Sequence, residues 1–132
     1  MAVLIGNEIK KLRTVGPIDA VTVIGPTLLL APITNQAVIT SIEIRCAAAV
    51  AITNEATITI EIDALPAFTA VPILTSQKLL GVTSADDRWT VVVRGGSVLV
   101  PSNAGLVRLT FDSAATGTSQ TLTVDVFGYL LA

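Results

Sequence analysis

The stretch Thr57-Ile58-Thr59-Ile60-Glu61-Ile62-Asp63 decides the fold of this chain, because isoleucine alternates in it with polar residues. Successive side chains of a β-strand point to opposite faces of the sheet. The stretch therefore predicts a strand, over residues 56–63, with its isoleucines on a core. Its threonines and carboxylates face water, as is typical of antiparallel sheets with one solvated side.

The same period of two recurs elsewhere and extends the prediction to a whole β domain. Alternating segments occupy residues 37–46, 106–112 and 121–127. Val, Ile and Thr contribute 16, 13 and 17 residues to the chain, and these β-branched side chains suit a pleated surface. Apolar runs predict further strands at residues 20–24, 27–31, 71–74, 78–82, 89–94 and 97–100. The best helical candidate is one turn near residues 9–12.

Turn signals between these segments indicate how the strands connect. Gly95-Gly96 stands between Val93-Arg94 and Ser97-Val98, which predicts a two-residue hairpin. Eight or more short strands at close spacing predict an all-β, antiparallel two-sheet sandwich. Longer crossings at residues 46–56 and 63–78 favour a jelly-roll or Greek-key path over a simple meander. A chain of 132 residues has the size of one domain, which we place at residues 17–132.

The first sixteen residues differ from the rest in charge. They carry a net charge of +2, whereas residues 17–132 carry five basic and nine acidic residues, a net charge of −4. This asymmetry favours an N-terminal arm that lies on the acidic surface of a neighbouring subunit. The alternative is a first β-strand followed by a solvated loop. The candidate residues of the arm are Leu4, Ile5, Lys10, Lys11 and Arg13.

No cluster of residues in the sequence predicts catalysis or a bound cofactor. The chain has no histidine, which removes the usual general base and the commonest ligand of transition metals. Glu61 and Asp63 share one strand face, and Asp86-Asp87 follow Thr83-Ser84, so a Ca²⁺ site is conceivable at either place. A solvated strand and a polar turn explain these carboxylates better. We expect no catalytic residue, no metal site, no cofactor and no enzymatic activity.

The single cysteine and the single tryptophan are both expected to be structural. Cys46 ends an alternating strand and has no partner for a disulfide, which is typical of a buried strand thiol. Trp89 heads an apolar strand. It is therefore a candidate core or interface aromatic rather than a platform for a sugar ring.

The low charge of the chain indicates an exterior that is partly covered. Charged residues make up 14% of the sequence and hydrophobic residues 52%, against about 25% charged residues in an average soluble domain. Either Thr, Ser and Ala cover a monomer, or neighbouring molecules cover part of the surface; we favour a permanent oligomer. A membrane is not an expected partner, because Pro26 and Pro32 would break a helix over the uncharged residues 20–42. Nucleic acid is not expected either, since the few basic residues at the start lack interleaved aromatics.

Four segments carry a resemblance to a known group of proteins. They are residues 28–32 (LLLAP), 37–44 (AVITSIEI), 97–106 (SVLVPSNAGL) and 121–130 (TLTVDVFGYL). Together with the spacing of the predicted strands over residues 18–132, this succession of segments resembles the small β-sandwich virion proteins of tailed bacteriophages. The resemblance is in particular to capsid decoration (cement) proteins and to head or tail accessory proteins.

The resemblance implies a function without catalytic residues. In such families a jelly roll sits on the assembled shell, often as a trimer, and a terminal arm commonly ties it to its neighbours. The expected partners are therefore other copies of the chain and the lattice of the major capsid protein, and the expected location is the capsid surface of a virion made in the host cytoplasm. Two alternatives stay open. One is a head–tail adaptor or tail component, and the other is a carbohydrate- or receptor-binding β-sandwich module.

Overall fold

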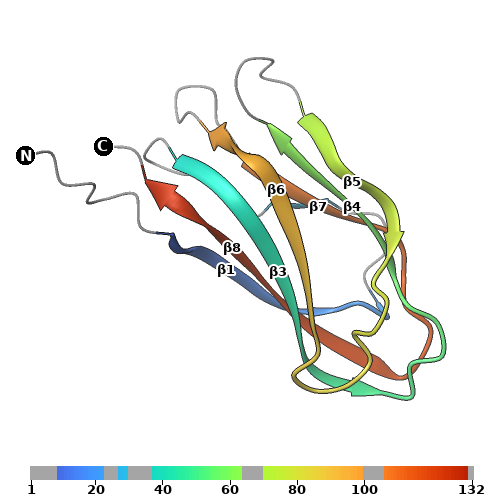
Figure 1. The fold of residues 1–132 in the computed structure, drawn as a ribbon. Helices are drawn as coiled ribbons and strands as arrows, with labels where there is room; N and C mark the ends of the chain where they lie inside the picture. The colour runs from blue at the N-terminus through green and yellow to red at the C-terminus, as the bar shows by residue number, and fades with distance from the viewer. Residues whose placement is uncertain (1–8, 23–26, 30–36, 64–69, 100–105, 131–132) are drawn as a thin grey trace, which may run out of the picture.

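The computed structural model describes residues 9–22, 27–29, 37–63, 70–99 and 106–130, and every regular element within them is a β-strand (Figure 1). The strands are β1 (Lys10–Asp19), β2 (Thr27–Leu29), β3 (Ala37–Val50), β4 (Thr57–Asp63), β5 (Ala70–Lys78), β6 (Arg88–Leu99), β7 (Leu106–Ser113) and β8 (Ser119–Leu130). The predicted all-β class is confirmed. Among the described residues there is no helix with the length and apolar character needed to cross a membrane.

The strands form two four-stranded sheets with the pairing of a jelly roll. Sheet A has the order β1-β8-β3-β6 and sheet B the order β2-β7-β4-β5. The first strand pairs with the last, β2 with β7, β3 with β6, and β4 with β5, all antiparallel. The chain is thus one long hairpin of four strand pairs that fall alternately in the two sheets. This eight-stranded path confirms the predicted jelly-roll sandwich.

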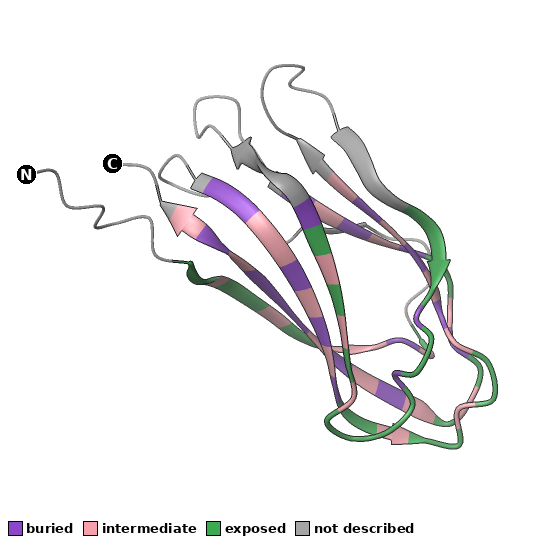
Figure 2. Ribbon diagram, in the orientation of Figure 1, coloured by how far each residue is buried: buried purple, intermediate pink, exposed green. Residues whose placement is uncertain are grey.

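The core lies between the two sheets and is built by the alternation seen in the sequence. Ile58 and Ile60 of β4 are fully buried and pair with Phe111 and Leu109 of β7. Opposite them, sheet A buries the alternate residues of β3 and β8, and Figure 2 shows the resulting banding along the strands. Full burial of one such side chain stabilises the fold by about 1.5–3 kcal/mol. The buried residues of sheet A include Ile42, Ile44, Cys46, Leu122, Val124 and Val126.

Two apolar runs that we assigned to strands close the end of the core instead. Residues 20–22 form a turn after β1, and residues 79–82 follow the end of β5. Ala20, Leu79 and Val82 have no exposed surface and belong to the core cluster. These residues are apolar because they are buried at the end of the sandwich. In the sequence, a short apolar run in a buried turn cannot be distinguished from a short buried strand. The predicted helical turn near residues 9–12 is also wrong, because β1 begins there.

Gly95-Gly96 does not form the predicted hairpin. Strand β6 continues through both glycines, and the two halves of β6 pair with the same neighbour, β3. The register jumps from Ser97 opposite Ile39 to Val92 opposite Ser41, so four residues of β6 stand against one of β3. Glycine within a strand commonly marks such an irregularity. The glycines therefore lie in an irregularity of β6 and do not reverse the chain.

We expect Ile44→Ala to destabilise the protein by about 2–5 kcal/mol, because it leaves a cavity in the core. The control is Val50→Ala on the same strand, where the side chain is exposed and the cost should stay within about 0.5 kcal/mol. Urea unfolding followed by Trp89 fluorescence measures both. Equal losses of stability would contradict the assignment of Ile44 to the core.

Candidate interaction surface

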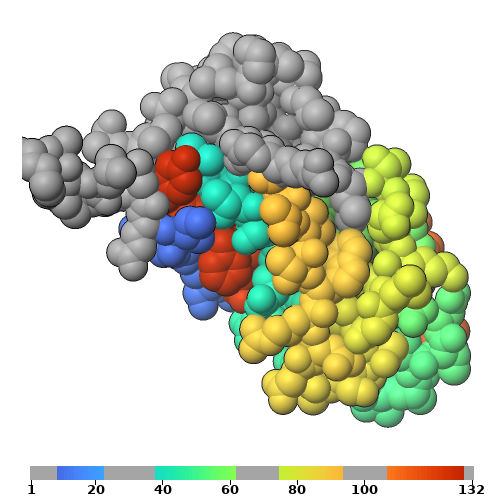
Figure 3. All heavy atoms as spheres, in the orientation of Figure 1, coloured from blue at the N-terminus to red at the C-terminus, as the bar shows by residue number. Residues whose placement is uncertain are grey.

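The outward face of sheet A is the surface with the most distinctive chemistry. Its residues alternate with the core residues and line up in rows across the paired strands. Figure 3 shows β1, β8, β3 and β6 side by side on the side toward the viewer. One row consists of Lys11, Phe127, Ser41 and Val92, and the next consists of Thr14, Asp125, Glu43 and Thr90.

Four charged side chains of this face form a ladder across β8, β3 and β6. Glu43 is directly opposite Asp125, and Arg45 is directly opposite Arg88, so like charges face each other, which by itself is destabilising. The diagonal contacts, in contrast, join opposite charges. Arg45 Nε lies 3.0 Å from Asp125 Oδ2, and Arg88 Nη1 lies 2.8 Å from Glu43 Oε1. The charged ladder, Glu43, Arg45, Arg88 and Asp125, therefore has no net charge.

Asp125 is the most buried member of the charged ladder. Its residue is 3% exposed although it points away from the core. Both carboxylate oxygens have donors: Thr14 Oγ1 donates to Oδ1 at 2.7 Å, and Arg45 Nε donates to Oδ2 at 3.0 Å. A buried carboxylate is tolerated when it is paired in this way. Asp125 thus links β1, β8 and β3 on the outer side of the sheet.

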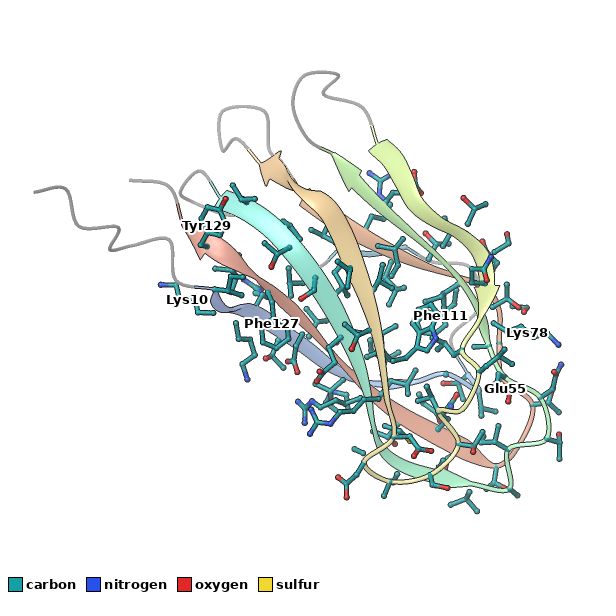
Figure 4. All side chains as sticks on the ribbon, viewed as in Figure 1. Lys10, Glu55, Lys78, Phe111, Phe127 and Tyr129 are labelled. Atoms are coloured by element: carbon teal, nitrogen blue, oxygen red, sulfur yellow. The ribbon has the colours of Figure 1, made fainter. Side chains whose placement is uncertain are left out.

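The other half of the same face carries its apolar side chains, beside the exposed Lys11 in the row of Phe127. Val92 is 71% exposed, and Phe127 and Tyr129 are half-buried. Val38, which pairs with Tyr129, is buried but does not belong to the core cluster between the sheets. In Figure 4, Phe111 lies between the sheets, whereas Phe127 and Tyr129 lie on β8 at the outer side of sheet A. We call Val38, Val92, Phe127 and Tyr129 the apolar patch.

Strand β1 places the basic residues of the candidate arm at an edge of sheet A. Lys10, Lys11 and Arg13 are exposed, and β1 pairs with β8 alone in the described sheet. Leu4 and Ile5 lie outside the described residues. The strand crosses Gly16-Pro17, the expected end of the arm, with a shift of register between Val15 and Ile18. Gly16 has a φ of +143° and a Cβ there would meet Leu122 O at 2.9 Å, so a larger residue does not fit this edge.

Of the carboxylates that we considered as ion ligands, Asp87 takes part in the structure of a turn. Asp87 Oδ2 accepts hydrogen bonds from the backbone N–H groups of Thr83 and Ser84, at 3.1 and 2.8 Å, which is turn chemistry. Glu61 is half-buried on β4, and the side chain of Asp63 is outside the described part. Within the described ranges, no three acidic, cysteine or histidine residues gather closely enough to hold a metal ion.

Trp89 and Cys46 both lie on the core side of sheet A. Trp89 is half-buried and packs against the core cluster, and Cys46 is a buried free thiol. Burial raises the pKa of the Cys46 thiol, and the nearby carboxylates of Asp87 and Asp86 raise it further. The thiol therefore stays protonated and unreactive near neutral pH.

Sequence reasoning missed both the charged ladder and the apolar patch. The outward positions of Glu43, Arg45 and Asp125 were visible from the alternation, but their pairing depends on which strands are neighbours. Phe127 fell on an outward position at the end of the predicted strand over residues 121–127, and Tyr129 lies two residues beyond it. Their outward positions in the alternation were the signal in the sequence for an apolar surface.

We expect Arg45→Ala to destabilise the fold by about 1–3 kcal/mol, because it leaves the buried Asp125 carboxylate without its charged partner. Arg88→Ala is the matched control. The side chain of Arg88 is 56% exposed, and its loss should cost about 0–1 kcal/mol. Adding Asp125→Asn to Arg45→Ala should recover part of the loss in urea unfolding. Equal effects of the two arginine variants would contradict the role of Asp125.

We expect the Cys46 thiol to react with a disulfide reagent such as Ellman's reagent only when the protein unfolds. Its raised pKa also makes stability depend on pH. The stability that the protonated thiol contributes is fully present below its pKa in the unfolded chain, about 8.5. It is lost as pH rises through the higher pKa that the thiol has in the folded protein. Cys46→Ala should flatten this part of the alkaline decline in urea midpoint. Rapid reaction of the folded protein at pH 8 would contradict the prediction.

The comparisons with known proteins find a similar fold, but they do not assign the chain to a family. No family model matches the chain, and no curated protein matches it. Among solved structures, a chain of the cyanophage Pam1 capsid asymmetric unit has a similar structure, with a TM-score of 0.52 and 18% sequence identity. The match covers 99% of this chain and 91% of that chain. The whole β-sandwich therefore has a counterpart of nearly the same extent in a phage capsid.

Proposed function

We propose that this chain is a non-enzymatic structural protein of a phage virion that binds the assembled capsid as a decoration or cement protein, as a trimer. The observation that carries the proposal is the match of the jelly roll, over nearly the full length of both chains, with a chain of a phage capsid asymmetric unit. The resemblance of the sequence to small β-sandwich virion proteins supports it independently.

The exterior of the chain supports a permanent contact rather than a transient one. Large apolar side chains stand exposed at Ile9, Val50, Leu80 and Val92, and the charged fraction is low at 14%. Obligate interfaces are more apolar than transient ones. A protein with such a surface stabilises its partner when it binds the assembled lattice and not the free subunits. A trimer strengthens this binding, because three linked weak contacts act at a high effective concentration.

The distribution of charge supports a role for the N-terminal segment between subunits. Lys10, Lys11 and Arg13 are exposed on β1, and the acidic residues Glu55 and Asp86 lie in the loops that follow β3 and β5. Figure 4 shows Lys10 and Glu55 far apart, toward opposite ends of the sandwich. In the proposed assembly the basic segment contacts an acidic surface of a neighbouring copy. Such a contact weakens as salt concentration rises.

The test is sedimentation of the purified chain with capsid shells of the same virus that were assembled without it. We expect the chain to co-sediment with shells and not with unassembled major capsid protein. Bound shells should then resist heat or denaturant better, because the ligand binds only the assembled state. Failure to bind shells would overturn the proposal.

The number of bound copies separates decoration from the alternative roles. A lattice protein saturates at hundreds of copies per shell, whereas an adaptor or tail component occupies six or twelve positions on one axis. A glycan array provides the second comparison. Specific binding to a glycan without binding to shells would favour the carbohydrate- or receptor-binding module.

A further inference from the structure

The edge strands of the two sheets differ in how far they are protected against pairing with another chain. An edge strand presents unpaired N–H and C=O groups, and proteins protect such edges with charged residues, proline, bulges or short strands. β1 has three basic residues, Pro17 and two shifts of register against β8. β5 has Pro72 and two shifts of register against β4, and β2 has only three residues. These three edges are therefore protected.

The edge of β6 has no such protection between Arg88 and Val93. The segment 89–93, Trp-Thr-Val-Val-Val, contains no charge and no proline, and residues 88–92 pair with β3 without a shift of register. Aromatic and β-branched residues of this kind favour strands. In the described sheet, β6 pairs with β3 alone, and Val92 is 71% exposed. This edge is therefore suited to accept a strand from another chain.

We propose that residues 3–8 of a second copy add to the edge of β6 as an antiparallel strand. The proposal rests on the proposed function for its homo-oligomer, and it names the segment and the edge that join the copies. An added strand needs backbone N–H groups, which proline lacks. Of the segments outside the described ranges that are longer than two residues, residues 1–8 are the one without proline. The other segments contain Pro26, Pro32, Pro66 and Pro101.

Charge sets the register of the added strand. When Glu8 stands opposite Arg88, antiparallel pairing places Leu4 opposite Val92. The Arg88 side chain is 56% exposed and contacts Glu43 at 2.8 Å, and a guanidinium has enough N–H donors to bind a second carboxylate. Leu4 then covers the exposed Val92. A shift of one residue would turn Glu8 to the core side of the sheet, because successive side chains point to opposite faces.

The added strand comes from another copy, because the chain's own residues cannot reach this place. Across the sheet, Lys10 lies level with Ile39 of β3, whereas Arg88 lies opposite Arg45. Residues 39 and 45 of an extended strand are about 20 Å apart. The added strand would also lie four strand spacings from β1, about 19 Å across the sheet. Glu8 is two residues from Lys10, and two residues span at most about 7 Å. A strand passed from each copy to the next closes a ring, as the proposed trimer requires.

The first experiment joins the two segments by a disulfide between chains. Leu4→Cys and Val92→Cys proteins are unfolded and refolded together under reducing conditions and then oxidised. Non-reducing electrophoresis should show a covalent dimer of twice the 13.6 kDa chain mass, well above the background of each variant alone. The matched control is Val50→Cys, an exposed valine on β3 away from this edge. It should give about tenfold less dimer with Leu4→Cys, because a disulfide needs Cα atoms within about 7 Å. Thr90→Cys, which is diagonal to Leu4 in the proposed register, should also give less.

The second experiment tests the register through charge. Glu8→Lys should weaken association about tenfold, because it sets two positive charges opposite each other. Adding Arg88→Glu to Glu8→Lys should restore association, since the opposite charges then face each other again. Deletion of residues 2–8 should leave a monomer. Sedimentation measures the mass of each variant, and circular dichroism verifies that each folds.

Five outcomes overturn the inference: a monomeric wild type, an oligomer that survives deletion of residues 2–8, equal cross-linking of Leu4→Cys to Val50→Cys, stronger cross-linking to Thr90→Cys, or a charge swap that restores nothing. Shell binding is measured separately on the same samples. A monomeric wild type that loses shell binding with residues 2–8 would assign the strand to the shell and overturn only the contact between copies. An oligomer that cross-links through Val92→Cys but ignores shells would overturn only the proposed function.

Discussion

The pairing of β8 with β3 is the constraint on which the rest of the structure depends. β8 lies between β1 and β3 in sheet A, and residues 119–130 pair with residues 37–50 along almost their whole length. This pairing joins segments that are far apart in the chain, so its entropic cost is large and the contacts must form cooperatively. Once it forms, β1 and β6 find their places on either side of the pair. The inner residues of β3 and β8 then face sheet B as one apolar surface.

The same pairing creates the outer face of sheet A and its two kinds of chemistry. The register that buries Ile42 against Val126 also sets Glu43 opposite Asp125 and Ser41 opposite Phe127. One end of the face is consequently a neutral network of charges, and the other end carries the apolar side chains beside Lys11. The network links β1, β8, β3 and β6 on the outer side of the sheet. A face divided in this way suits a protein whose proposed work is to bind neighbours.

The alternation of the sequence was sufficient to predict the central strands and the class of the fold. Ile58 and Ile60 are buried because their side chains point to one face of a strand, and this follows from the geometry of an extended backbone. The prediction was weaker where apolar residues occur without alternation. Ala20, Leu79 and Val82 are buried in turns and loops at the end of the core. Gly95-Gly96 has the composition of a hairpin turn but lies within β6, because both halves of that strand continue along β3.

The sequence by itself determined that this protein is a β-sandwich with few charges, no histidine and one buried thiol, because composition and period are local properties of a chain. It also determined which residues point outward on the strands whose residues alternate. Only the tertiary structure decided which outward residues meet. The ion pairs of Arg45 with Asp125 and of Arg88 with Glu43, and the gathering of Val38, Val92, Phe127 and Tyr129 on one face, depend on the order and register of β1, β8, β3 and β6. That order is set by contacts between distant segments, which no local pattern encodes.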